Sequence, residues 1–170
     1  TAVGVTIPDR HYLLDFLKQL EARGLGDRFN YLAGHTVEQI PIPALTKAGK
    51  AALITDVHGA LAYTAHPDSL LAKYANLLAP EGNIFFFLGK STWVNGSYAG
   101  FMDWVKSIKG FEIVIDTHGI SSTDGETLVR FGLKRNTEPV RIPALTLESI
   151  TDDTPPVRRY RTTTALKVKQ

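Results

Sequence analysis

Residues 66–89, "HPDSLLAKYANLLAPEGNIFFFLG", contain the helix, turn and strand pattern on which the fold prediction rests. Asp68 or Ser69 can cap a helix, and Pro80-Glu81-Gly82 predicts the turn that follows it. The apolar run "NIFFFLG", residues 83–89, then predicts a strand that is covered on both faces. Apolar side chains at helical spacing form one face of the helix: Leu70, Leu71, Tyr74, Leu77 and Leu78.

The same alternation of strand and helix continues on both sides of this stretch. The further predicted strands cover residues 2–7, 28–33, 51–57, 111–117 and 126–135. The further predicted helices run from Asp9 to Gly24 and across the segment that ends at Gly110. The proline-rich segment 40–50 predicts a loop. We therefore expect an α/β fold with one mostly parallel sheet, a C-terminal antiparallel hairpin and flanking helices.

The end of the chain lacks this alternation. Residues 136–170 contain four prolines and the basic run "RRYR" at 158–161. We expect a domain over residues 1–135 and an irregular C-terminal extension over residues 136–170. The basic run either touches phosphates or forms a solvated tail.

Composition narrows the possible functions. The 170 residues carry a net charge of +2, which gives no reason to expect a nucleic-acid partner. The absence of Cys excludes disulfides, thiolate metal ligands and a Cys nucleophile, and it favours a reducing, cytoplasmic compartment. No apolar run reaches the roughly 20 residues of a membrane span. No His pair has metal-ligand spacing, so we expect no metal site.

Polar residues follow the predicted third strand in "LITDVHGALAYT", residues 53–64. Ligands in open parallel sheets bind beyond the carboxyl ends of the strands. Asp56 therefore either holds a hydroxyl or amine of a ligand or caps the next turn. His58 is either a general base or a loop His bonded to the backbone. Tyr63 either lines an acceptor pocket or packs on the helix that follows.

Two other groups of residues have alternative interpretations. Trp93, Tyr98 and Trp104 either form an aromatic wall over a small molecule or, for Trp104, belong to the core. The run Asp9-Arg10-His11 either contacts a ribose or begins the first helix as its cap.

Residues 2–134 resemble the S-adenosylmethionine-dependent methyltransferases with a Rossmann-like fold. The resemblance is carried by "LEARGLGDRFNYLAGHTVEQIP", by "AALITDVHGALAYTAHPDSLLAKYANLLAPEGNIFFF" and by the closing hairpin "FEIVID" with "TLVRFGLKR". "GVTIPDRH", residues 4–11, is also similar to the G-[VL]-T-L-S-x-x-Q stretch of the cyclopropane and mycolic acid synthase branch. The resemblance implies S-adenosylmethionine as cofactor and methyl transfer to a small-molecule or carrier-bound acceptor.

The resemblance also implies roles for particular residues. Thr6 stands where many relatives have a ribose-binding acid, and His11 stands where the synthase branch has Gln. His35 replaces the acid that usually reads the adenine amino group. His58 is the first candidate for a catalytic base and Tyr63 is the second. The implied cofactor-binding residues are Thr6, His11, Gly34, His35, Thr36, Asp56 and Gly59.

The chain departs from the family in ways that define an alternative function. The family's glycine-rich loop and first strand, which lies between its second and fourth strands, are absent from these residues. We expect an N-terminal segment or a partner chain to supply that strand, because unpaired central edges are costly. The alternative is a non-catalytic methyltransferase-like module that acts as a protein-interaction scaffold. A domain that binds NAD is disfavoured because G-x-G-x-x-G is missing.

Overall fold

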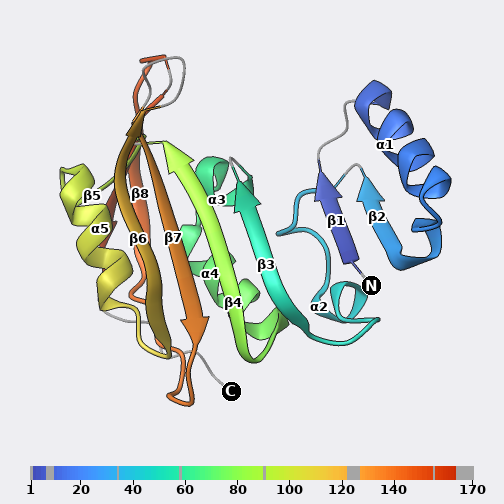
Figure 1. Ribbon diagram of the computed structural model, residues 1–170. Helices are drawn as coiled ribbons and strands as arrows, with labels where there is room; N and C mark the ends of the chain where they lie inside the picture. The colour runs from blue at the N-terminus through green and yellow to red at the C-terminus, as the bar shows by residue number, and fades with distance from the viewer. Residues whose placement is uncertain are drawn as a thin grey trace. The chain divides into compact units, whose positions relative to one another are not determined.

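The computed structural model describes residues 2–6, 10–33, 35–57, 59–89, 91–121, 127–154 and 156–163 (Figure 1). The chain divides into two compact units, Thr1–Gly49 and Lys50–Gln170. Within the described residues, no helix is long and apolar enough to cross a membrane.

The first unit contains a pair of parallel strands, β1 (Ala2–Thr6) and β2 (Phe29–Ala33). The crossover that a parallel pair requires contains α1 (Arg10–Ala22) and the 3-10 helix η1 (Gly26–Arg28). Gly24 follows α1 with a φ of +65°, a conformation that glycine adopts without steric cost.

A short helix, α2 (Ile42–Leu45), lies in the proline-rich segment that the sequence predicts to be a loop. That expectation is wrong for these four residues. A proline in the first turn of a helix needs no intrahelical N–H partner, so Pro43 is tolerated there.

The second unit is built on a four-stranded sheet with the order β3-β4-β7-β6. β3 (Ala51–Val57) runs parallel to β4 (Leu78–Gly89), whereas β4 is antiparallel to β7 (Thr127–Arg135). β6 (Phe111–Ser121) is antiparallel to β7, so the predicted C-terminal hairpin is confirmed.

Three helices lie on one side of this sheet: α3 (Ala60–Tyr63), α4 (Pro67–Leu77) and α5 (Tyr98–Ser107) (Figure 1). Phe86 of β4 faces Phe131 of β7, and their ring centroids are 5.2 Å apart. Phe101 of α5 covers this pair, with its centroid 6.4 Å from that of Phe131. The three aromatic side chains are buried and join the sheet to the helices.

A third sheet has the order β5-β9-β8 and contains β5 (Thr92–Val94), β8 (Leu145–Ile150) and β9 (Arg158–Thr162). Two strands therefore lie in the segment for which an irregular extension is expected. The basic run at 158–161 lies in β9, and its three arginines have partners. The Arg158 guanidinium lies 5.6 Å from the centroid of Tyr63, and that of Arg159 lies 5.4 Å from the centroid of Trp93. Arg161 forms a 2.6 Å salt bridge with Glu148.

The expected Rossmann-like, mostly parallel sheet is wrong. The four-stranded sheet contains one parallel pair, β3–β4, and β7 lies antiparallel between β4 and β6. The chain stops alternating strand and helix after residue 110, and a direct hairpin enforces antiparallel strands. The remaining strands form separate sheets, β1–β2 and β5-β9-β8. The observed fold is mixed α/β with mixed sheets.

The pH dependence of stability provides a test of the packing around Tyr160 in β9. Burial raises the pKa of Tyr160 from 10.0 to about 12, an effect that Arg158 opposes and Asp68 supports. Above pH 10 the unfolded chain loses the tyrosine proton while the folded chain keeps it. The free energy of unfolding therefore falls as pH rises towards 12.

We expect Tyr160→Phe to remove this component of the pH dependence. At neutral pH the variant loses the 2.7 Å hydrogen bond from the Tyr160 hydroxyl to the Thr64 carbonyl, a cost of about 1 kcal/mol. Urea unfolding at a series of pH values from 8 to about 11.5, around the ordinary tyrosine pKa, measures both effects. Parallel stability curves for the two proteins above pH 10 would contradict the assignment.

Candidate functional site

A carboxylate is buried at the end of β3. Asp56 is 4% exposed, and its Oδ2 accepts hydrogen bonds from the Leu61 backbone N–H at 3.1 Å and the Tyr74 hydroxyl at 2.5 Å. Asp56 thereby connects β3 to α3 and α4. Its other oxygen, Oδ1, is also buried and has no hydrogen-bond partner within the described part of the chain.

The strand pattern explains how this carboxylate reaches the interior. Side chains alternate between the two faces of a strand, so Asp56 lies on the same face as Ile54. Asp56 also pairs in register with the buried Phe86 of β4. The helices cover this face, and the acid therefore lies in the core and not in solvent.

Gly59 gives the chain room to turn directly beside the carboxylate. A Cβ at Gly59 would lie 2.6 Å from Asp56 Oδ1, closer than real Cβ atoms approach an oxygen. Glycine at this position therefore allows backbone to pass within contact distance of the unpartnered oxygen.

An unpartnered carboxylate oxygen is energetically costly in a protein core. Leaving a buried acceptor without a donor costs about 1–3 kcal/mol, and more for a charged group. Leu61 and Tyr74 satisfy one oxygen, and no other described residue satisfies the second. The arrangement can therefore accept a further N–H or O–H donor, which is the chemistry of an amine or hydroxyl of a ligand.

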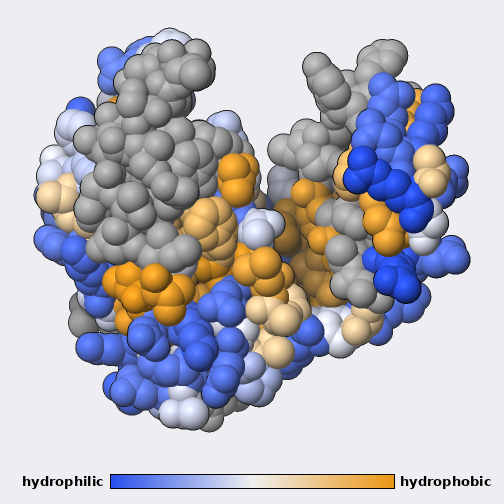
Figure 2. Space-filling view, in the orientation of Figure 1, coloured by the Kyte–Doolittle hydropathy of each residue, from blue (hydrophilic) through white to orange (hydrophobic). Residues whose placement is uncertain are grey.

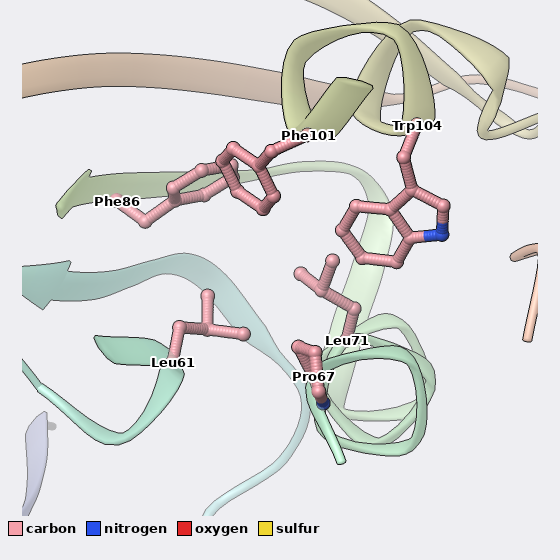
Figure 3. A pocket seen from close by; sticks show the side chains of 6 residues that line it. All are labelled: Leu61, Pro67, Leu71, Phe86, Phe101 and Trp104. Atoms are coloured by element: carbon pink, nitrogen blue, oxygen red, sulfur yellow. The ribbon is translucent and has the colours of Figure 1, made fainter. Parts of the chain in front are cut away.

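A cavity of about 10 Å³ lies near this site (Figure 3). Its volume corresponds to about one water-sized sphere, too small for an organic ligand. It is a packing gap between the sheet and the helices. The residues that line it are Leu61, Pro67, Leu71, Phe86, Phe101 and Trp104.

A wider groove of about 400 Å³ runs along α5. Trp104 lines it, whereas the residues predicted for catalysis or cofactor binding do not. The groove is bordered on one side by Asn95, whose Oδ1 accepts a 3.1 Å hydrogen bond from the Thr162 backbone N–H. Its lining residues are Asn95, Ser97, Ala99, Gly100, Asp103, Trp104, Ser107 and Thr162.

In the unit Thr1–Gly49, three predicted site positions lie at one end of the two-stranded sheet. Thr6 ends β1 and pairs with Ala33, the last residue of β2, so residues 35 and 36 follow at the same end. His35 is exposed and Thr36 is half-buried. The Thr36 N–H donates a 3.1 Å hydrogen bond to Gln39 Oε1.

The other predicted positions divide between described and undescribed residues. His11 lies in α1, where the structure describes its backbone. Gly34 and His58 lie outside the described residues. In the unit Lys50–Gln170, the structure brings Asp56 and Gly59 together.

The structure decides between the alternatives for Trp104, and it places the Tyr63 ring on the surface. Tyr63 ends α3 with 66% of its surface exposed, and its ring contacts Arg158. Trp104 is 3% exposed, and its indole N–H donates a 2.8 Å hydrogen bond to the Pro143 carbonyl. Trp104 therefore belongs to the core and not to an aromatic wall over a ligand.

Sequence reasoning assigned Tyr74 only to the apolar face of a helix and missed its contact with Asp56. A signal was present, because a tyrosine among leucines on a buried helix face carries a hydroxyl that needs a partner. The partner itself lies 18 residues away in the sequence, and helical periodicity does not identify it.

The contact between Gly59 and Asp56 can be tested by a double-mutant cycle. We expect Gly59→Ala to lower the free energy of unfolding by about 1–3 kcal/mol, because the new methyl group displaces the carboxylate. The same substitution in an Asp56→Ala background should cost clearly less. Both tryptophans, Trp93 and Trp104, lie in this unit and report its unfolding by fluorescence. Equal costs in the two backgrounds would exclude the contact.

Comparisons with known proteins do not assign the chain to a family. No model of a known protein family matches the sequence. A search of curated proteins likewise finds no significant match.

Proposed function

We propose that this chain takes part in S-adenosylmethionine-dependent methyl transfer, with the Asp56 carboxylate accepting a hydrogen bond from the amino group of the cofactor. The observation that carries the proposal is the buried Oδ1 of Asp56 beside Gly59, which has no hydrogen-bond partner among the described residues. The identity of the cofactor comes from the sequence resemblance over residues 2–134. The proposal does not rest on a Rossmann-like sheet.

The chemistry of the Asp56 carboxylate suits the amino group of such a cofactor. Its amino acid end carries an ammonium group, and ammonium donates charge-assisted hydrogen bonds to carboxylates. Asp56 offers one acceptor oxygen, and Gly59 lacks the side chain that would block an approach to it. Because Oδ1 is enclosed, the proposal requires the chain beside Gly59 to move before a ligand reaches this oxygen.

The chain's own contribution to methyl transfer is positioning. The cofactor supplies a methyl group on a positively charged sulfur, which is open to in-line displacement by an acceptor atom. Orienting the two reactants removes much of the entropic barrier. A base is needed when the acceptor must lose a proton, and His58 and Tyr63 stay the proposed candidates for that role. The exposed ring of Tyr63 is accessible to an acceptor.

A second candidate function is that of a non-catalytic interaction module. Leu53 and Val57 on the edge strand β3 are 58% and 55% exposed. Exposed apolar side chains on an unpaired sheet edge are typical of a surface that binds another strand. This candidate requires no cofactor.

Calorimetric titration with S-adenosylhomocysteine separates the two functions. We expect saturable binding by the native chain and at least tenfold weaker binding by Asp56→Asn, which keeps the side-chain shape but removes the charge. Asp68→Asn is the matched control, because Asp68 is also buried and also has one oxygen without a hydrogen bond in the described chain. Its other oxygen accepts from the Leu145 N–H at 3.2 Å, away from Gly59.

The outcomes separate the candidates clearly. Saturable binding that only Asp56→Asn weakens supports the proposed cofactor site. The absence of heat up to millimolar ligand, with a folded native chain, would overturn the methyltransferase proposal and favour the interaction module. Equal weakening by both variants would show that charge at Asp56 has no specific role in binding.

A further inference from the structure

The position of α3 controls access to Oδ1 of Asp56. Asp56 lies on the helix-covered face of β3, and Leu53 and Val57 make the opposite face of the strand apolar. Figure 2 shows apolar surface along the position of β3. A polar ligand of the carboxylate therefore comes from the helix side, where the backbone of Gly59 lies against Oδ1.

Gly59 and α3 form one hydrogen-bonded turn. The Gly59 carbonyl accepts a 3.0 Å hydrogen bond from the Ala62 N–H, and the Ala60 carbonyl accepts one of 2.9 Å from the Thr64 N–H. α3 has four residues, and so short a helix is not stable without tertiary contacts. The groups that hold its two ends therefore set its position.

Asp56 itself holds the first end of α3, and β9 holds the second. Oδ2 of Asp56 accepts the 3.1 Å hydrogen bond from the Leu61 N–H. At the other end, the Tyr160 hydroxyl donates a 2.7 Å hydrogen bond to the carbonyl of Thr64, the residue that follows α3. Both partners of this second bond are buried, with 1% and 6% of their surface exposed.

β9 gives this contact a fixed support. It is the central strand of its sheet, parallel to β5 and antiparallel to β8. Hydrogen bonds on both sides hold the backbone of a central strand, so it opens less readily than a single helical turn. Arg158 of β9 adds a contact, because its guanidinium lies over the ring of Tyr63 at the end of α3.

We propose that Tyr160 is a positioning residue that, through Thr64, holds α3 closed over Oδ1 of Asp56. Breaking this one hydrogen bond is then a step in opening the site. The two bonded residues are 96 positions apart in the sequence, so the C-terminal strands control the end of β3. The identity of the ligand rests on the proposed function, whereas the control of α3 by Tyr160 does not.

Hydrogen exchange of the Leu61 amide measures this control without a ligand. The amide donates to Asp56 and exchanges when α3 opens. We expect Tyr160→Phe to accelerate its exchange about fivefold, the effect of one lost hydrogen bond on an opening equilibrium. Ser97→Ala is the matched control, because it also removes one hydrogen bond, the 3.0 Å bond from the Gly100 N–H that caps α5.

The control separates a local effect from a general loss of stability. Both substitutions should accelerate the exchange of amides in the central strand β4, which open on global unfolding. Only Tyr160→Phe should accelerate exchange at Leu61. An unchanged rate at Leu61 in Tyr160→Phe would overturn the proposal, and so would an equal acceleration there by Ser97→Ala. Circular dichroism shows whether each variant is folded.

The rate of association with S-adenosylhomocysteine, followed by stopped flow, provides the second measurement. We expect Tyr160→Phe to associate about fivefold faster, because a larger fraction of the chain is open, and Ser97→Ala to match the native chain. A native chain that binds no ligand would overturn the proposed function, and exchange at Leu61 would still decide the role of Tyr160. Faster exchange with an unchanged association rate would show that α3 does not control access.

Discussion

The second unit depends on one row of side chains that runs across its sheet. Asp56, Phe86 and Phe131 lie opposite one another on β3, β4 and β7. Removing the two phenylalanine rings from water is favourable, and Phe101 of α5 packs on them. Because Asp56 belongs to the same row, covering the aromatic pair also buries a carboxylate.

Burial of that carboxylate shapes the surrounding chain. Tyr74 and Leu61 supply donors to one oxygen, which fixes α4 and α3 against the end of β3. Gly59 lacks the Cβ that would collide with the other oxygen. A partly satisfied polar group in a core is costly unless it has a use. The proposed function gives it one, as the acceptor for a cationic ligand.

The two faces of β3 differ in their exposure to solvent. The face that carries Ile54 and Asp56 is directed at the helices, whereas Leu53 and Val57 on the other face are exposed. Ligand binding through Asp56 uses groups on the helix-covered face of this strand.

Much of the local structure could be predicted because it depends on periodicity and on turn residues. The apolar spacing from Leu70 to Leu77 indicates α4, and the run 83–89 lies within β4. The short link between residues 121 and 127 indicates the β6–β7 hairpin, because a direct link between strands enforces antiparallel pairing. The apolar spacing around Trp104 likewise indicates its place in the core. These signals come from residues close together in the chain.

The sheet order and the content of the site depended on contacts between distant residues. Resemblance to a mostly parallel family gave the wrong sheet. The structure pairs β4 with β7 antiparallel and places Phe131 against Phe86, a contact between distant residues that periodicity does not reveal. Irregular composition concealed β9, which is held by Tyr160 bonding to Thr64, 96 residues away.

The candidate site likewise combines a feature visible in the sequence with contacts that form only in the folded chain. The order of residues along the chain was enough to place Asp56 near the end of an apolar strand and Gly59 just after it. The folded chain alone shows that Tyr74 and Leu61 occupy one oxygen of the acid, while no described residue donates to the other. The physical reason is that burial and hydrogen bonding depend on which elements pack together, and a linear pattern does not contain that information.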